Sequence, residues 1–137
     1  MKRLQRKFRA WDKEESKMWK VVSMSESIWG DCEEAYVSVC DFDKSPGDKD
    51  TDIRGLVYFD LMQFTGLKDI NGKDIYEGDI VKCYQSHNSL VCSKMYSYGL
   101  DTKGMGFTPF YEVYGQCEII GNIHENPELL EVQHERD

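Results

Sequence analysis

The clearest secondary-structure signals of the chain lie in the segment Leu61–Tyr84, which reads LMQFTGLKDINGKDIYEGDIVKCY. At its centre, Asn71-Gly72 stands between short runs of alternating apolar residues. Asn and Gly accept the positive φ that both central positions of a type I′ hairpin turn require, so this dipeptide predicts such a turn. A second turn is predicted at Glu77-Gly78-Asp79, directly before the β-branched pair Ile80-Val81. The segment therefore predicts a turn, a short strand, a second turn and a strand.

Length and composition predict one domain, or one domain with an appended arm. The chain has 137 residues, of which 40% are hydrophobic and 12% aromatic, enough to form a core. No apolar run approaches the roughly 20 residues that span a bilayer, and no apolar segment of a signal peptide follows the basic N-terminus. The five cysteines are scattered, which predicts reduced thiols in a cytoplasm.

Charge is distributed unevenly along the chain. Residues 1–22 carry eight basic and three acidic side chains, a balance of +5. Because the whole chain has a net charge of −8, the remainder carries −13. An acidic body argues against general binding to nucleic acid, since phosphate contacts need clustered Lys and Arg. The basic N-terminal segment is the exception.

Two short alternating runs in that segment predict an N-terminal β-hairpin arm over residues 1–22. Phe8–Asp12 and Lys17–Val21 flank a polar connection of hairpin length, and Trp11 and Trp19 could meet across the ladder. One interpretation is a surface that engages a phosphate backbone or a stacked base. The other is a structural hairpin with a solvated basic face, which the usual exposure of Lys and Arg favours. The hypothetical binding residues are Arg3, Arg6, Lys7, Arg9, Trp11 and Trp19.

The remaining chain predicts a mainly β protein. We expect a variable connection and a strand over residues 23–54, then a small SH3-like β-barrel in residues 55–125. Ser97–Pro109, which contains three glycines, predicts a loop or insertion, and Asn126-Pro127-Glu128 predicts the start of a short C-terminal helix. The core domain would span residues 55–137, with one or two short helices in all.

No enzyme signature or cofactor motif is found, so we expect no catalytic residues, no cofactor and no metal. Asp69-Ile70-Asn71-Gly72 begins like a calcium loop, but Lys73 stands where an oxygen ligand belongs. Cys83, His87, Cys92 and Cys117 lack the paired spacing of a zinc site. Glu77 and Asp79 could act as paired carboxylates, but a hydrogen-bonded turn explains them better.

Three blocks of sequence, in order, resemble the YopX family of phage and prophage proteins. They are Phe8–Asp12 with Lys17-Met18-Trp19, then Leu61–Asp69 with Asn71–Lys73 and Ile75–Val81, and finally Ile120–Leu130. The resemblance implies a phage or prophage of Gram-positive bacteria and a small, self-associating cytoplasmic protein. It implies no activity and no catalytic residues.

Three hypotheses of function remain open. The first is a non-catalytic phage accessory protein that binds host or phage proteins and forms a homo-oligomer, without membrane contact. The second is a regulatory protein that binds nucleic acid through the basic arm. The third is an enzyme with an unrecognised site, which a pocket lined by His87, His124 or Cys92 would support.

Overall fold

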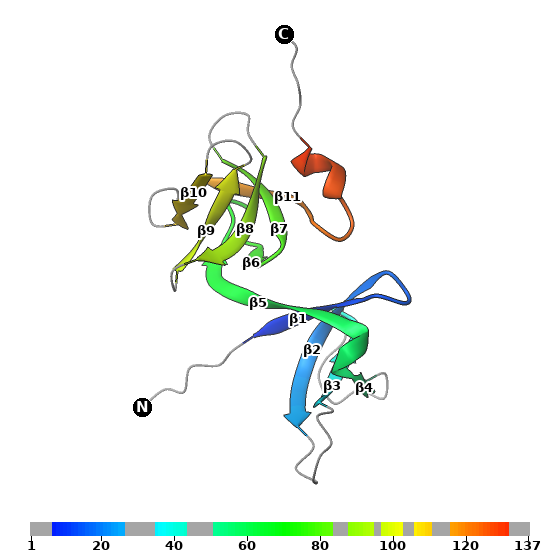
Figure 1. The fold of residues 1–137 in the computed structure, drawn as a ribbon. Coiled ribbons are helices and arrows are strands. Elements are labelled where there is room, and N and C mark those ends of the chain that lie inside the picture. The colour runs from blue at the N-terminus through cyan, green and yellow to red at the C-terminus, as the bar shows by residue number, and fades with distance from the viewer. Residues whose placement is uncertain are drawn as a thin grey trace, which may run out of the picture. The chain divides into compact units, whose positions relative to one another are not determined.

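The computed structural model describes residues 7–26, 35–43, 51–83, 88–94, 97–102, 106–110 and 116–131. The chain divides into two compact units, Met1–Gln63 and Phe64–Asp137. The described residues form strands and two short 3-10 helices, which confirms the mainly β prediction (Figure 1). The strand β5, Phe59–Lys68, belongs to both units because the division falls within it.

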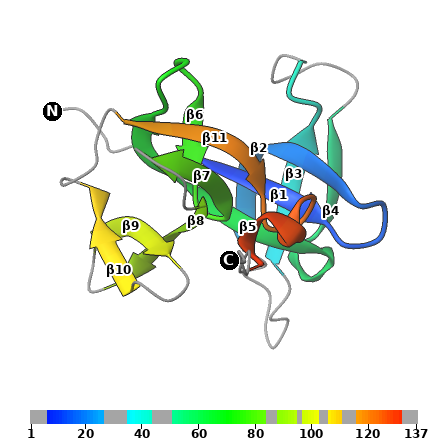
Figure 2. The same ribbon diagram turned by 90° about the horizontal axis from the view of Figure 1, so that it is seen from above.

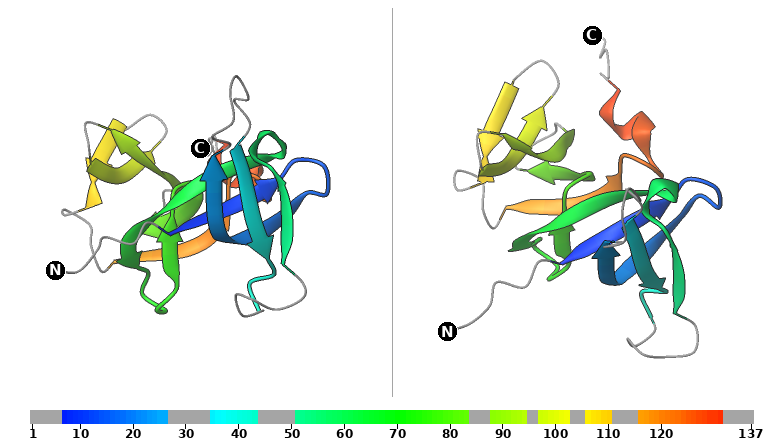
Figure 3. Two further views of the ribbon diagram at one scale, coloured as in Figure 1. Left: turned by 90° about the horizontal axis from the view of Figure 1, so that it is seen from below. Right: turned by 60° about the horizontal axis from the view of Figure 1, so that its bottom comes forward.

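The first unit is an antiparallel sheet with the strand order β4-β3-β2-β1-β5. Its strands β2, β3 and β4 lie side by side in the left view of Figure 3. The bounds are β1 Phe8–Asp12, β2 Lys17–Glu26, β3 Ala35–Cys40 and β4 Asp52–Gly55, followed by the 3-10 helix η1, Leu56–Tyr58.

The core of this unit lies on one face of the sheet. Ala10, Val37, Val39 and Phe59 are buried there, and the partly buried Trp19, Val21 and Leu61 pack against them. Alternation places Ala10 on the same face as its cross-strand partner Trp19, so the hairpin closes over the core.

The predicted N-terminal hairpin is therefore present, but its two tryptophans do not pair. Trp11 stands opposite Met18, and Trp19 stands opposite Ala10. Adjacent residues of a strand point to opposite faces, so Trp11 and Trp19 lie on different faces of the sheet. The expected contact between Trp11 and Trp19 is not formed, because the register of the hairpin places Met18, one residue before Trp19, opposite Trp11.

The second unit contains a five-stranded antiparallel sheet with the order β10-β9-β8-β7-β11. The bounds are β7 Asp79–Cys83, β8 Asn88–Lys94, β9 Ser97–Thr102, β10 Gly106–Pro109 and β11 Cys117–Asn122. Figure 2 shows β9 and β10 side by side at one end of this sheet. The short strand β6, Asp74–Tyr76, pairs with the second half of β5.

A second core fills this unit. Ile75, Val81, Val91, Leu100, Phe110 and Cys117 are buried together, and Leu67, Cys83, Tyr98 and Ile119 pack against them. No closed barrel is found among the described strands, so the SH3-like barrel predicted for residues 55–125 is not confirmed.

The loop predicted over Ser97–Pro109 is wrong, because β9 and β10 occupy most of it. The glycine that suggested a loop has a packing role. A Cβ atom at Gly99 would lie 2.5 Å from the Phe107 ring and 2.5 Å from the Thr108 carbonyl oxygen. Gly99 is thus required inside a strand because the paired strand packs against it.

The predicted C-terminal helix is present as η2, Pro127–Leu130, with Pro127 in its first turn. Asn126 does not cap this helix with its side chain. Its Oδ1 accepts a hydrogen bond from the Asn122 amide at 3.2 Å instead. No helix among the described residues is long and apolar enough to cross a membrane.

Candidate functional site

A buried carboxylate, Asp12, organises the turn of the N-terminal hairpin. Its side chain is 0% exposed and accepts hydrogen bonds from the amides of Glu14 at 2.9 Å and Glu15 at 3.1 Å. The Trp19 indole Nε1 donates to the same carboxylate at 3.3 Å. A carboxylate that is buried away from water is stabilised when hydrogen-bond donors replace that water. Here the turn amides and Trp19 are the donors, so Asp12 links the turn to both strands of the hairpin.

Arg54, from β4, supplies the countercharge. Its Nη2 lies 2.7 Å from Asp12 Oδ2, although the two residues are 42 positions apart in the sequence. The guanidinium also lies over the Phe59 ring, 4.7 Å from its centroid, and 5.7 Å from the centroid of Trp19. The pair therefore ties the hairpin turn to the outer strand of the same unit.

Burial and hydrogen bonding act in opposite directions on the Asp12 pKa. Burial alone would raise it, but the Glu15 amide, the Arg54 guanidinium, the Glu14 amide and the Trp19 indole together hold it below its ordinary value. Asp12 therefore remains ionised, and its two oxygens already accept four hydrogen bonds within the protein. We assign it a structural role.

A second buried carboxylate, Asp69, organises the turn between β5 and β6. Its Oδ1 accepts hydrogen bonds from the amides of Asn71 at 2.8 Å and Lys73 at 2.9 Å, and its Oδ2 accepts one from the Ile119 amide at 3.0 Å. Burial would raise the pKa of Asp69, but these three amides and the charge of Lys73 hold it below its ordinary value. The carboxylate thus joins the turn to β11.

This turn lies where the sequence predicts it, but it is not type I′. The Gly72 amide donates to the Asp69 carbonyl at 3.0 Å, and Gly72 has φ +83°. Among the described residues only Ser16 is a non-glycine with positive φ, so Asn71 lacks the conformation that type I′ requires. Asp at the first position and a left-handed Gly at the fourth are typical of a type I turn followed by a bulge.

The turn predicted at Glu77-Gly78-Asp79 is confirmed as the link between β6 and β7. Asp79 is 2% exposed, and its Oδ2 accepts a hydrogen bond from the Tyr76 amide at 2.8 Å. Gly78 has φ +90°, which glycine adopts without strain. Its amide and carbonyl bond to Val91 and Ile123, at 2.9 and 2.8 Å. Asp79 is therefore a turn residue, and Glu77 instead accepts a bond from Ser93 at 3.2 Å.

The closing block of the sequence is also built around a buried polar side chain. Asn122 Oδ1 accepts hydrogen bonds from the amides of His124 at 3.0 Å and Glu125 at 2.9 Å. A Cβ atom at Gly121 would lie 2.5 Å from Asn126 Oδ1, so this position admits only glycine without rearrangement. The block thus forms a tight turn after β11.

The residues proposed to bind nucleic acid have different surroundings. Arg3 and Arg6 lie outside the described residues, and Lys7 is exposed. Arg9 is only 8% exposed, Trp11 is half-buried, and both have contacts within the protein. Trp19 packs on the core, and the Lys17 Nζ lies 3.9 Å from its ring centroid. Lys7 is thus the described member of this set that is most accessible.

Two of the cysteines form a disulfide. Cys83 and Cys117 stand directly opposite each other in the β7–β11 ladder, with their Cα atoms 4.3 Å apart and an S–S bond of 1.99 Å. The prediction of reduced thiols throughout is wrong for this pair, because antiparallel pairing of distant segments brings them together. Cys92 is a partly buried free thiol, and Cys40 is buried and is not part of this disulfide.

The residues considered for metal binding or catalysis do not gather into one group. His87 lies outside the described residues, and the amide of His124 contributes to the Asn122 turn. Burial raises the pKa of the Cys92 thiol, and Asp101 and Glu77 raise it further against the opposing effect of Lys94. Within the described ranges no three His, Cys, Asp or Glu side chains are arranged to hold a metal ion.

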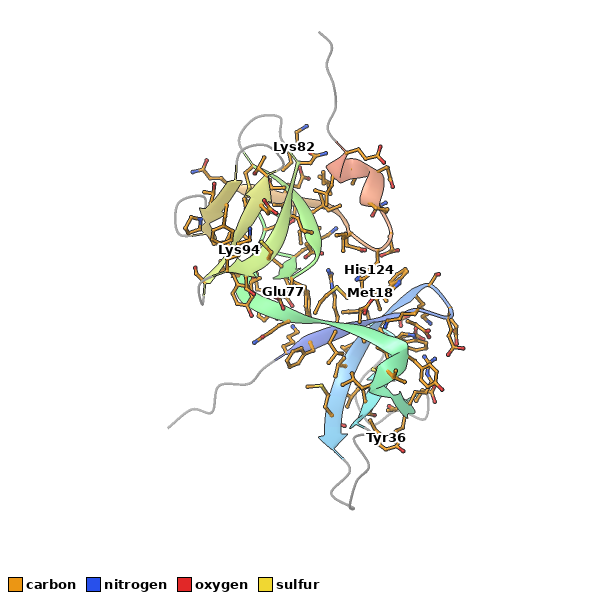
Figure 4. The ribbon with its side chains drawn as sticks, in the orientation of Figure 1. Met18, Tyr36, Glu77, Lys82, Lys94 and His124 are labelled. Carbon is orange, nitrogen blue, oxygen red and sulfur yellow. A yellow bond between two sulfur atoms is a disulfide. The ribbon has the colours of Figure 1, made fainter. Side chains whose placement is uncertain are left out.

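Among the residues that the structure describes, more of the exposed large apolar side chains lie in the first unit than in the second. In the first unit these exposed residues are Met24, Tyr36, Phe42, Ile53, Val57 and Tyr58. The second unit contributes Ile70 and Ile123. Tyr36 and Ile53 lie on one face of the sheet, whereas Met24, which stands opposite Val37, lies on the other. Figure 4 shows Tyr36 projecting outward at the end of its sheet.

Sequence reasoning did not find Arg54 or Asn122. The first takes part in a pair that spans 42 residues, for which no local pattern exists. Asn122 had a local signal, because an Asn side chain that accepts a hydrogen bond from the backbone amide two residues later is typical of an Asx turn. The role of Asp69 could also have been found from this signal, because Asp-x-Asn-Gly favours the same motif.

These features define a small β protein of two units in which the polar residues of the sequence motifs hold turns together. The YopX protein family model matches residues 7–131, and the chain belongs to this family. Its structure is similar to the crystal structure of protein EF1440 from Enterococcus faecalis, with a TM-score of 0.58 and 28% identity. That match covers 94% of this chain and 100% of the other. No curated protein matches.

Proposed function

We propose that the chain is a non-catalytic accessory protein of a phage or prophage, which binds proteins and associates with copies of itself. The observation that carries this proposal is the concentration of exposed apolar side chains in the first unit, where Ile53 and Val57 are 68% and 75% exposed. Burying such side chains against a partner contributes about 25 cal/mol per Å² of apolar surface.

The use of the polar motif residues supports a role without catalysis. Asp12, Asp69 and Asp79 each accept hydrogen bonds from backbone amides, and Asn122 does the same. Catalytic acids and bases need a free position for substrate, and their pKa values are usually moved towards neutrality. The pKa values of Asp12 and Asp69 move in the opposite direction.

Self-association is tested by light scattering during size-exclusion chromatography at tens of micromolar protein. We expect a mass above the 16.0 kDa of one chain, whereas a monomer would refute the homo-oligomer. Binding to host or phage proteins is tested by affinity capture with C-terminally tagged protein, with and without nuclease. Proteins that persist after nuclease treatment support the proposal, and proteins that disappear point to nucleic acid.

A second candidate is nucleic-acid binding through the basic arm, which the charge of +5 in residues 1–22 favours. Replacing Arg3, Arg6 and Lys7 by Gln should then weaken binding to DNA or RNA and reduce the slope of affinity against salt by about 0.7–0.9 per lost contact. The matched control replaces three exposed lysines of the second unit, Lys68, Lys82 and Lys94. Equal losses in both variants would refute a specific role of the arm.

The host cytoplasm remains the proposed location, and the Cys83–Cys117 disulfide provides a test of it. Structural disulfides are rare in reducing compartments. If the location is cytoplasmic, the bond should form only after the cells are opened, so trapping free thiols in intact cells with a maleimide should find both cysteines reduced. A pair that is fully protected from the maleimide in fresh cells would argue for an oxidising location.

We also retain the small SH3-like barrel as a proposal for residues 55–125. The Ile70 amide donates to the Cys117 carbonyl at 3.0 Å, and the Ile119 amide donates to Asp69 Oδ2 at 3.0 Å. These bonds hold the turn between β5 and β6 against β11, which is one of the contacts that a closed barrel would need. A crystal structure with continuous pairing around the strands would support the barrel, and two separate sheets would refute it.

A further inference from the structure

The strand β4, Asp52–Gly55, is the outer strand of the first unit's sheet. It pairs with β3 along one edge, and in the part of the chain that the structure describes no strand pairs with its other edge. An outer strand presents backbone N–H and C=O groups that can pair with another chain. Such an edge is a site for strand addition.

An apolar surface lies beside this edge. Tyr36 pairs with Gly55 and Ser38 pairs with Ile53, so alternation places Tyr36 and Ile53 on one face of the sheet. Ile53 is 68% exposed, and Tyr36 is 39% exposed. A Cβ atom at Gly55 would lie 3.6 Å from the Tyr58 ring, so Tyr58 lies beside Gly55 on the same face. The three side chains form the β4 patch.

The sequence of β4 is self-complementary in an antiparallel arrangement. If Ile53 stands opposite the same residue of a second copy, Asp52 stands opposite Arg54 and Arg54 opposite Asp52. Directly opposite residues of unlike charge stabilise an antiparallel pair by about 0.2–1 kcal/mol, and like charges destabilise it. Asp52 and Arg54 lie on the same face of the strand, where Arg54 Nε is 3.3 Å from Asp52 Oδ2, and their side chains are 56% and 21% exposed. In the dimer each Asp52 would therefore be shared between the Arg54 of its own strand and that of the second copy.

We propose that two copies of this chain associate by antiparallel pairing of their β4 strands about a two-fold axis at Ile53. The pairing continues the sheet across the axis and brings the two β4 patches together on one face. An arrangement of this kind is closed, because each copy uses the same surface. This inference rests on the self-association proposed above and assigns it a surface and a register.

Cysteine cross-linking tests the surface. Ile53→Cys places two thiols opposite each other at the axis, whereas Ile70→Cys places a thiol at a similarly exposed position of the second unit. Both variants are made in a background in which Cys32 and Cys92 are replaced by Ser. We expect Ile53→Cys to form a covalent dimer under mild oxidation, on the order of tenfold more than Ile70→Cys.

Charge reversal tests the register. Asp52→Lys places a lysine opposite Arg54 of the second copy, so it should lower cross-linking through Ile53→Cys several-fold. The control is Asp43→Lys, which changes the net charge equally at an exposed position outside the strand. Equal effects of the two reversals would overturn the register.

These measurements distinguish a wrong choice of interaction surface from an absence of self-association. If the unmodified chain has the mass of a dimer or larger oligomer but Ile53→Cys and Ile70→Cys cross-link equally, self-association stands and the β4 surface is wrong. If the unmodified chain is still a monomer in light scattering at about 100 µM, a concentration at which a dimer of micromolar affinity would form, both are wrong.

Discussion

The two units of the chain use their apolar residues differently. In the first unit, four residues are buried together and six large apolar side chains are exposed in the described part of the chain. In the second unit, six residues are buried together and two such side chains are exposed. The second unit is also cross-linked by a disulfide. Under the proposed function, the exposed apolar side chains of the first unit would be the ones that a partner covers.

Polar stabilisation differs between the units in the same way. In the first unit, the fully buried Asp12 pairs with Arg54, which is 21% exposed, and also accepts hydrogen bonds from two backbone amides and the Trp19 indole. In the second unit, Asp69 is stabilised chiefly by backbone amides, with the charge of Lys73 as a smaller contribution. Loss of Asp12 should therefore cost more than loss of Asp69, since two amides, the Trp19 indole and Arg54 lose their acceptor together, although Arg54 keeps Asp52 at 3.3 Å.

The largest expected effect is that of Asp12→Ala, which removes the acceptor of four hydrogen bonds and leaves Arg54 without its nearest counterion. We expect a loss of about 3–5 kcal/mol in the free energy of unfolding. Urea denaturation at pH 7 measures it. The control is Asp60→Ala, whose exposed pair with Lys13 should contribute about 0–1 kcal/mol. Equal losses for both variants would contradict the role of Asp12.

Removal of the Cys83–Cys117 disulfide should have the next largest effect on the free energy of unfolding, because the bond stabilises the second unit. The bond closes a segment of 34 residues, for which loop-closure entropy predicts about 3–4 kcal/mol. Cys83→Ser with Cys117→Ser is compared with the unmodified chain in oxidising and reducing buffer. Dithiothreitol should lower the stability of the unmodified chain only. A loss of stability with dithiothreitol in the double variant would contradict this account.

Asp69→Ala should cost about 2–3 kcal/mol, because the amides of Asn71, Lys73 and Ile119 lose their acceptor. Hydrogen exchange should show the loss of protection at those amides in the variant. Glu118→Ala, at an exposed carboxylate that accepts one bond from Asn71, is the control. Unchanged protection at the Ile119 amide would show that Asp69 does not hold β11.

The smallest effect concerns pH. The folded pKa values of Asp12 and Asp69 lie below the ordinary value of 3.8. Their contribution to stability is therefore complete above the unfolded pKa and is lost as pH falls through the folded pKa. The free energy of unfolding should fall below about pH 4. Asp69→Asn should show a shallower fall, and an identical profile would contradict the assigned pKa direction.

Much of the fold could be predicted from local pattern. The alternation of Phe8–Asp12 and Lys17–Val21 predicts a hairpin, and Gly78 with Asp79 predicts a turn, because each signal lies within a few residues. The position of the Asn71-Gly72 turn was also correct. Its type was not, because the Asp69 carboxylate binds the amides of the turn and selects another geometry.

The remainder depends on contacts between distant segments. Gly99 signals a loop locally, but the packing of Phe107 requires it within a strand. The Cys83–Cys117 bond and the Asp12–Arg54 pair join positions 34 and 42 residues apart. The β4 patch depends on strand order, which the sequence does not reveal. The candidate surface was therefore less predictable than the fold.

The most direct test compares two isoleucines, one in each unit. Ile53 is 68% exposed in the first unit, and Ile70 is 56% exposed in the second. The mass of Ile53→Lys and Ile70→Lys is measured by light scattering across a concentration series, with circular dichroism to confirm that both fold. We predict that Ile53→Lys is a monomer and that Ile70→Lys keeps the mass of the unmodified chain. The reverse result would place the interaction surface in the second unit and contradict this account.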